Sequence, residues 1–211
     1  MHRFNRGADF EMVAFIHGIA GQSQLSKVMW ELICLPGDGI LYFPILLPIG
    51  AAAWYLEYFP RLNREQSYLL TYLYVVLLVD LLLNFAMKGM VKRKRPHFHN
   101  DDMRFPGPDK YSFPSGHATR AGALVALFST LLQYEPDLLS LATAGLTSRT
   151  STSMCLTVAW TWAAINSFGR LALGRHFVSD VVVGTFIGYS LFFPVARGVM
   201  FWVYPPHVLA D

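Results

Sequence analysis

Three short clusters of basic, hydroxyl and imidazole side chains stand out in a chain that is otherwise apolar. They occupy residues 88–96, 114–117 and 170–180. Fixed cations and hydrogen-bond donors stabilise the negative charge that spreads over the oxygens of a transferring phosphoryl group. Together the three clusters predict a site for an anionic group such as phosphate.

The third cluster contains a histidine and an aspartate at helical spacing. His176 and Asp180 are four residues apart and therefore share one face of a helix. A carboxylate beside a histidine fixes its tautomer and makes the far ring nitrogen more basic or more nucleophilic. The pair predicts a nucleophile or a base, with a plain structural contact as the alternative.

The second cluster, Pro114-Ser115-Gly116-His117, precedes an apolar run and is typical of a helix start with Ser115 near the N-cap. The unpaired N–H groups of a first helical turn bind phosphate. His117 would lie in that turn, where it could give a proton to a leaving oxygen. The alternative is that His117 is an interfacial polar residue.

Cations for the predicted site would come from Lys88, Arg95 and Arg170. An arginine can hold two oxygens at once, whereas a lysine acts as a point charge. The remaining basic residues of the first cluster are expected in a loop that faces solvent or lipid headgroups. They are Lys92, Arg93 and Lys94.

The composition indicates a single-domain integral membrane protein. Of the 211 residues, 54% are hydrophobic and 15% are charged, whereas soluble domains carry about 25% charged residues. Disorder, a coiled coil and a collagen-like repeat are excluded by this composition. Cys34 and Cys155 are the only cysteines, so a disulfide scaffold is excluded and both are expected to be inert packing residues.

Five apolar segments are long enough, or nearly so, to cross about 30 Å of hydrocarbon as helices. They are residues 39–58, 68–87, 118–134, 154–168 and 181–203. Residues 138–146 are too short to cross and are assigned to the surface. With this assignment the three clusters meet on one face of the membrane, whereas one further crossing would separate them.

The N-terminal region, residues 1–36, alternates apolar and charged residues at helical spacing. This pattern predicts an amphipathic or half-inserted first helix, with one imperfect span as the alternative. About six helices would then form an all-α membrane bundle. Residues 37–211 would be its catalytic part.

Asp80 lies inside an apolar segment, where a charge is costly unless it is paired. Asp80, Asn84 and Lys88 are spaced by four residues and form a polar stripe that leads to the predicted site. We expect Arg120, on the neighbouring helix, to pair with Asp80 and lock the two helices together. The alternative is that Asp80 bonds only Asn84 and buried water.

Taken in order, the motifs Lys-x6-Arg-Pro, Pro-Ser-Gly-His and Arg-x5-His-x3-Asp resemble the signature of the type 2 phosphatidic acid phosphatase superfamily. The ordered triplet is highly specific, and the resemblance covers residues 37–189. Within the superfamily, the strings around the motifs look most like the polyisoprenoid diphosphate phosphatase branch. Substrates of that branch include presqualene and farnesyl diphosphates.

The resemblance implies a metal-independent lipid phosphatase on a six-helix membrane bundle, with no cofactor. By match to the motifs, His176 would attack phosphorus and form a phosphohistidine, Asp180 would orient it, and His117 would protonate the departing oxygen. The phosphoryl oxygens would be held by Lys88, Arg95, Ser115, Gly116 and Arg170.

Gly169 departs from the family pattern, which normally has a serine before this arginine. The resemblance therefore implies that one supporting hydroxyl is absent and that activity is lower. No metal site is expected, because Asp101, Asp102 and Asp109 lie in a Pro/Gly-rich loop without a matching set of partners.

The expected partners are a lipid phosphate or diphosphate and the bilayer, with no nucleic acid. Two alternatives stay open: a phosphatase for phosphatidic acid, lysolipid or sphingoid phosphates, and an inactive membrane scaffold of the same fold. An endoplasmic reticulum or nuclear-envelope location follows from the resemblance alone. The lipid tail, the side of the membrane that the site faces and the oligomeric state are left open.

Overall fold

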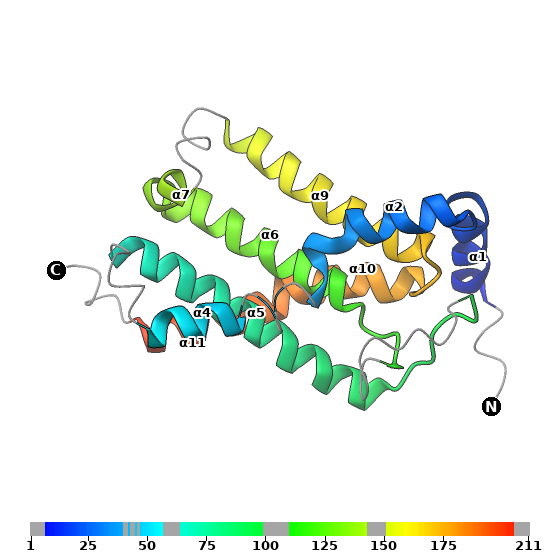
Figure 1. Ribbon diagram of the computed structural model, residues 1–211, viewed down its shortest axis with the longest axis horizontal. Coiled ribbons are helices and arrows are strands. Elements are labelled where there is room, and N and C mark those ends of the chain that lie inside the picture. Colours follow the sequence, from blue (N-terminus) through cyan, green and yellow to red (C-terminus); the bar gives the residue numbers. More distant parts are fainter. Residues whose placement is uncertain are drawn as a thin grey trace.

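The computed structural model describes residues 7–39, 42, 45, 47–56, 64–98, 110–142 and 151–204. The described part of the chain is an all-α bundle (Figure 1). In chain order its elements are α1 (Ala8–Ala20), α2 (Gln24–Cys34), η1 (Leu35–Gly37), α4 (Leu47–Tyr55), α5 (Arg64–Val91), α6 (Gly116–Tyr134), α7 (Pro136–Ala142), α9 (Thr152–Ala172), α10 (Val178–Ile187), η5 (Gly188–Phe192) and α11 (Phe193–Val203).

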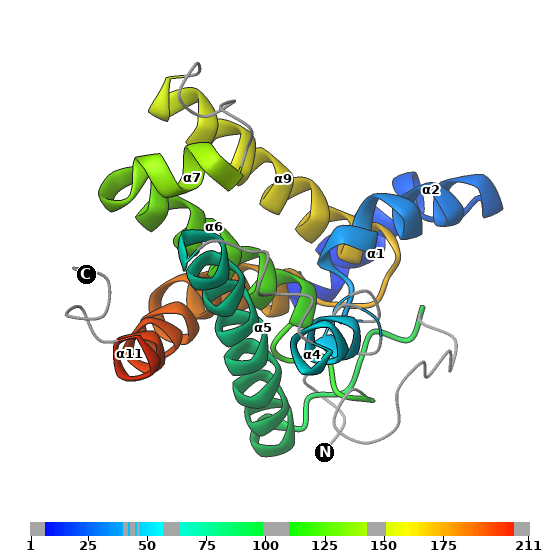
Figure 2. The ribbon, with the colours of Figure 1, turned by 60° about the vertical axis from the view of Figure 1, so that its left-hand side comes forward.

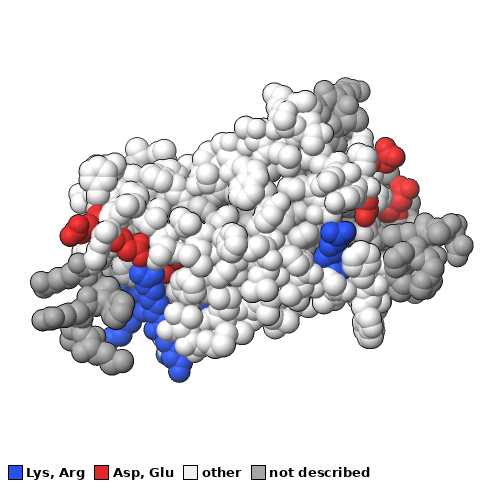
Figure 3. Space-filling view, turned by 180° about the vertical axis from the view of Figure 1, so that it is seen from behind, with Lys and Arg blue, Asp and Glu red and all other residues white. Residues whose placement is uncertain are grey.

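The surface of the bundle is that of a membrane-spanning protein. Two helical stretches, Glu65–Val91 and Val178–Val203, are long and apolar enough to cross a bilayer by length and composition. Figure 3 shows charged side chains gathered at the two ends of one face, with a wide uncharged band between them. Large apolar side chains such as Leu82, Phe186 and Trp202 are exposed, as expected where lipid replaces water.

The apolar segments expected from the sequence correspond to the long helices. Residues 68–87, 118–134 and 154–168 lie within α5, α6 and α9, and residues 181–203 lie within the continuous stretch α10–η5–α11. The described part of residues 39–58 contains α4. The short segment at 138–146 begins as α7, which packs against α5 and α6; its part beyond residue 142 lies outside the described residues.

Small residues let α6 approach α10 and η5 closely. A Cβ at Gly122 would collide with the carbonyl oxygen of Thr185, and one at Gly188 would collide with the carbonyl oxygen of Thr119. Membrane helices associate through close backbone packing of this kind, because the hydrophobic effect does little to drive helices together within lipid. The contact fixes α10, and hence the turn before it, relative to α6.

The last helical stretch changes pitch in its middle. η5 is a single π-helical turn directly before α11, and Phe193 donates its N–H to the carbonyl of Gly188. Pro194 follows at the start of α11, and a proline has no N–H with which to continue the α-helical pattern. The wider turn absorbs this break while the stretch continues in one direction.

The N-terminal region forms two helices rather than one. α1 has 13 residues and α2 has 11, each well short of the roughly 20 residues that cross a bilayer. Neither helix alone is long enough to form the single span that was the alternative. α1 buries Val13 against α6, α9 and α10 and exposes Phe15 and Ile19, and α2 crosses α9 in both Figure 1 and Figure 2.

Candidate active site

Four helix ends meet at one end of the bundle. Lys94 and Tyr111 form an isolated antiparallel bridge after α5. The Ser112 N–H donates to the carbonyl of Arg93 at 2.8 Å, and the Ser115 N–H donates to the carbonyl of Asp180 at 3.1 Å. These backbone contacts join the three sequence motifs, so the residues predicted from separate clusters are brought together.

His176 is buried at the centre of this assembly, 2% exposed. It follows a turn after α9 in which Gly174 has a φ of +66°, a conformation that favours glycine. Its Nδ1 lies 2.8 Å from the Ser112 carbonyl oxygen, so Nδ1–H donates there and the lone pair is on Nε2. Nε2 lies 3.2 Å from Nη1 of Arg95.

The surroundings of His176 disfavour its protonated form. Burial lowers the pKa of His176 well below its usual 6.5, and the positive charges of Arg95, Lys88 and Arg170 lower it further. A neutral imidazole whose Nδ1 proton is held by a carbonyl presents Nε2 as a nucleophile or a base.

Asp180 contacts His176 less directly than its spacing suggests. Asp180 Oδ2 is 3.7 Å from His176 Nδ1 and accepts the Phe177 N–H at 2.9 Å. Asp180 Oδ1 is 2.7 Å from Nη1 of Arg93. The Ser112 carbonyl, which no motif indicated, is the group that orients the imidazole.

Arg93 corrects an expectation. We expected it in a solvated or headgroup-facing loop, but its guanidinium lies between Asp180 and Asp9 and over the ring of Phe177. The loop turns there, at Lys92 with a φ of 51°, which directs the Arg93 side chain inward. Lys92 and Lys94 are exposed, as expected.

A set of buried polar atoms beside His176 has no hydrogen-bond partner among the described residues. They are Ser115 Oγ, His117 Nε2, and Nε and Nη1 of Arg170. Ser115 is the N-cap of α6, yet its side chain makes no capping bond. Buried donors without partners cost free energy. A phosphoryl group placed among them would satisfy several at once, with the N–H groups of Gly116 and the first turn of α6 beside it.

The other two predicted cations are held by backbone carbonyls at the same site. Lys88 is 2% exposed and donates from Nζ to the Tyr111 carbonyl at 2.9 Å. Arg95 donates from Nη1 to the Arg175 carbonyl at 3.0 Å. Their placement is fixed by the loop, so their charges are preorganised toward the position of an anion.

The structure explains why residue 169 is a glycine, which the sequence alone does not. A Cβ there would lie under 3.0 Å from Cys34 Sγ and 3.1 Å from Cε3 of Trp30, so α2 occupies the space of a side chain. Cys34 is 1% exposed and its thiol is 3.4 Å from the Asn166 carbonyl oxygen. Cys34 is thus a packing residue, as expected, and fills the space beside Gly169, the neighbour of Arg170.

Asp80 and Arg120 lie together in the core. Arg120 Nη2 is 2.9 Å from Asp80 Oδ2, and both residues are buried. Thr119 donates to Asp80 Oδ1 at 2.6 Å, and Asn84 donates to Thr119 at 3.1 Å rather than to Asp80. Arg120 also donates to the Gly37 carbonyl at 2.6 Å. The pair therefore connects α5, α6 and η1 beneath the site.

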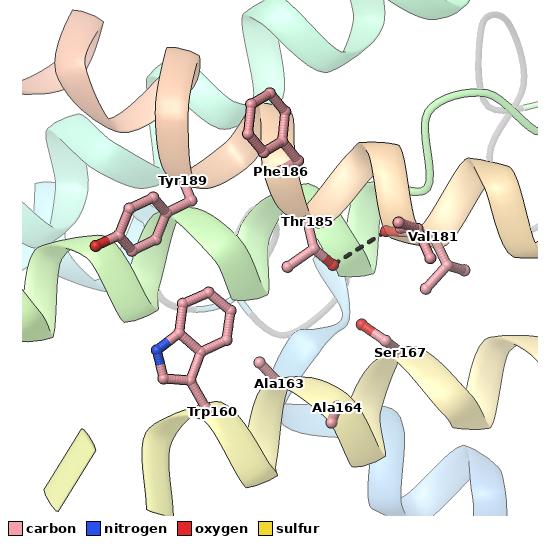
Figure 4. Close-up of a pocket in the computed structure, with 9 residues that line it drawn as sticks. Trp160, Ala163, Ala164, Ser167, Val181, Thr185, Phe186 and Tyr189 are labelled. Atoms are coloured by element: carbon pink, nitrogen blue, oxygen red, sulfur yellow. Dashed lines mark hydrogen bonds between the residues drawn. The ribbon is translucent and has the colours of Figure 1, made fainter. Parts of the chain in front are cut away.

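An apolar groove of about 600 Å³ runs between α9 and α10 (Figure 4). Ser167, one turn before Arg170, and Val181, next to Asp180, line the end nearest the site. The rings of Trp160 and Tyr189, 5.5 Å apart, lie at the far end. The volume and the apolar lining of the groove suit a hydrocarbon chain.

The sequence did not indicate three acidic contacts that come from the first 38 residues. Asp9 binds Arg93, Glu31 binds Arg175, and Asp38 Oδ2 lies 3.9 Å from His117 Nε2. Only the presence of acids in an otherwise apolar region could have pointed to them. Within the described part of the chain no three His, Cys, Asp or Glu residues are grouped to hold a metal ion. Asp101, Asp102 and Asp109 lie outside it.

Comparison with known proteins agrees with this geometry. The family model described as PAP2 superfamily matches residues 68–204. Phosphatidylglycerophosphatase B of Bacillus subtilis (strain 168) is 29% identical over 174 residues, 82% of this chain and 75% of the relative. A probable lipid phosphate phosphatase beta of Arabidopsis thaliana is 32% identical over 145 residues, 58% of this chain and 62% of the relative.

A solved structure has the same fold. The crystal structure of the transmembrane PAP2 type phosphatidylglycerolphosphate phosphatase from Bacillus subtilis superposes with a TM-score of 0.63 at 24% identity, covering 94% of this chain and 87% of the other. The family match includes all three motifs and the buried groups around His176. The chain therefore belongs to the PAP2 superfamily and is a membrane phosphatase of that family.

Proposed function

We propose that this phosphatase hydrolyses a lipid phosphate or diphosphate with His176 as its nucleophile. The observation that carries the proposal is the set of buried, unpaired atoms on Ser115, His117 and Arg170 beside a neutral His176. Groups so arranged are suited to bind an anion whose phosphorus lies next to Nε2.

The proposed reaction has two displacement steps. Nε2 of His176 forms a bond to phosphorus while the P–O bond to the lipid breaks. Burial and the surrounding cations lower the pKa of His117 in the free protein. The negative charge of the bound phosphate opposes this, so that His117 holds a proton in the complex and gives it to the departing oxygen. Lys88, Arg95, Ser115, Gly116 and Arg170 hold the phosphoryl oxygens. The imidazole becomes positive, 3.7 Å from the Asp180 carboxylate. Water then attacks phosphorus, His117 accepts its proton, and phosphate and free His176 are released.

The position of the site favours a substrate with a hydrocarbon tail. The groove between α9 and α10 is lined mainly by apolar side chains, and its lining includes Ser167 and Val181, which precede Arg170 by one turn and follow Asp180 directly. Two of its lining residues, Val182 and Phe186, are exposed on the surface. A tail could therefore lie in the groove while the phosphate meets the cations.

We propose a polyisoprenoid diphosphate such as farnesyl or presqualene diphosphate as the substrate. The strings around the three motifs support this choice, and the groove between α9 and α10 suits an isoprenoid chain. The second candidate is a glycerophospholipid phosphate, favoured by the names of the phosphatidylglycerophosphatase and lipid phosphate phosphatase relatives. A location in the endoplasmic reticulum or nuclear envelope belongs to the first candidate and is tested by imaging a tagged chain.

The test is phosphate release by detergent-purified protein from farnesyl diphosphate, phosphatidic acid and phosphatidylglycerol phosphate in excess EDTA. Release that survives EDTA and is lost in His176→Ala supports the histidine mechanism. The ratio of the release rates for the three substrates identifies the preferred lipid tail. Release that EDTA abolishes would refute that mechanism. No release from any of the lipids would favour the inactive scaffold.

A second experiment tests the groove. Ala164 lines it from α9 and is exposed, so Ala164→Trp would fill the space without disturbing the core. The matched control is Ile165→Trp, at the next position of the same helix and also exposed. We expect Ala164→Trp to raise the KM for long-tailed substrates about 10-fold and to leave short-tailed substrates unaffected. Equal effects of the two variants would contradict a tail in this groove.

A further inference from the structure

The first turn of α1 contacts the catalytic turn from outside the residues that the family model matches. Asp9 Oδ1 accepts the Ser179 backbone N–H at 3.1 Å, and Asp9 Oδ2 accepts the Ser179 hydroxyl. Asp9 Oδ2 is also 2.8 Å from Nη2 of Arg93. One carboxylate of the N-terminal region thus binds both the first and the third motif.

Arg93 connects these contacts to the nucleophile. Its Nη1 donates to Ser179 Oγ at 2.6 Å and to Asp180 Oδ1 at 2.7 Å. Its guanidinium carbon lies 4.0 Å from the centre of the Phe177 ring. Its backbone carbonyl accepts the Ser112 N–H, and the Ser112 carbonyl holds Nδ1 of His176. A planar guanidinium can span two carboxylates in this way, whereas an ammonium cannot.

We infer that Asp9 and Arg93 are positioning residues of the catalytic centre. Asp9 holds the Arg93 guanidinium, and Arg93 holds the Asp180 carboxylate 3.7 Å from His176, so that the Ser112 carbonyl takes the Nδ1 proton. This rests on the proposed function only in naming His176 as the nucleophile. It makes α1 part of the catalytic unit.

The charges around His176 give the inference a distinctive signature. Those that face it come from every element packed against it: Lys88 of α5, Arg95 of the following loop, His117 of α6, Arg170 of α9 and Asp180 of α10. Arg93 is balanced by Asp9 and Asp180. Without the Arg93 charge, Asp180 is uncompensated and raises the pKa of His176. Without the Asp9 charge, the positive charge of Arg93 is only partly neutralised and lowers the pKa of His176.

The experiment compares Asp9→Asn with Arg93→Gln in the full chain in detergent. Titration of His176 is followed by NMR of 13C-labelled histidine, with His176→Gln assigning the signal, and kcat and KM are measured in parallel. We expect the two variants to shift the titration in opposite directions, upward for Arg93→Gln. Both should lower kcat about 10-fold with little change in KM, because each loses a charge-assisted hydrogen bond but neither contacts the phosphate.

Three further variants separate positioning from general damage. Glu11→Gln, an exposed acid on the same helix, and Lys92→Gln, the exposed neighbour of Arg93, should match wild type. Arg93→Lys keeps the positive charge but cannot donate to both carboxylates as the guanidinium does. It should therefore retain the wild-type titration of His176 while its kcat falls. Thermal unfolding of each variant within a few degrees of wild type excludes a folding defect.

The inference is overturned if Asp9→Asn leaves both kcat and the His176 titration unchanged, or if both variants shift the titration in one direction. If the wild type releases no phosphate, the proposed function fails, while the NMR titration still decides the positioning. If Arg93→Gln does not fold, Asp9→Asn decides it alone, since the Asp9 side chain is 29% exposed and its change is isosteric.

Discussion

Introducing a serine at Gly169 restores the residue that the family normally has before the third-motif arginine. From the motif alone this change should add a hydroxyl and raise activity. The structure predicts the reverse. The new Cβ would lie under 3.0 Å from Cys34 Sγ and 3.1 Å from Cε3 of Trp30, whereas ordinary contact begins at 3.4 Å. Either α2 or the end of α9 must move.

The size of the effect follows from this collision. Inserting a side chain into a close-packed contact costs about 1–3 kcal/mol, which lowers Tm by roughly 2–12 °C for a chain of this size. Because Arg170 is the next residue, we also expect kcat to fall. Replacing the thiol removes the obstacle, so Cys34→Ala combined with Gly169→Ser should recover stability and activity relative to Gly169→Ser alone.

The assay is a double-mutant cycle of thermal unfolding in detergent and phosphate release, on wild type, both single variants and the double variant. A coupling that makes the double variant more stable than the sum of the single changes supports direct contact between the two positions. The reasoning is refuted if Gly169→Ser alone is as stable as wild type and more active, or if the two losses simply add.

Three further outcomes are expected. Breaking the buried ion pair with Asp80→Asn or Arg120→Gln should destabilise the fold by about 3–5 kcal/mol, and the double variant should recover part of that loss; additive losses in Tm would count against the pair. Arg170→Lys should lower kcat about 100-fold because it removes guanidinium donors from the phosphate position, and a rate near wild type would show that these donors are not used. Since burial and neighbouring cations lower the pKa of His176, the acid limb of kcat/KM, which reports loss of its neutral form, should be centred below the usual 6.5; an acid limb centred above 6.5 would contradict a depressed pKa.

Much of the architecture could be predicted because the bilayer imposes a simple rule on sequence. A segment that crosses hydrocarbon must be apolar over a fixed length, so α5, α6, α9 and the last helical stretch were visible as runs. The N-terminal region was harder, because α1 and α2 are short and half-exposed. The break between α1 and α2 falls between two moderately apolar stretches. The minimum length of a membrane-spanning helix does not distinguish two short helices from one imperfect span.

The site was predictable to the extent that its chemistry requires particular side chains in a fixed order. Lys88, Arg95, His117, Arg170 and His176 were recognisable by type and spacing, and Asp80 by the cost of an unpaired charge among apolar residues. Arg93 was misplaced, because three neighbouring basic residues look alike in sequence. Only the turn at Lys92 and the acids of α1 and α10 distinguish the one that points inward.

The sequence was therefore enough to predict the class of fold, the motif residues and a site for an anionic group, since these depend on composition and on spacing along one chain. Only the packed structure shows which carbonyl holds the imidazole of His176, why a side chain at residue 169 would collide with α2 and which N-terminal acid reaches the turn before α10. Those features depend on contacts between segments up to 170 residues apart. No local pattern records such a contact, because it exists only after the helices have packed.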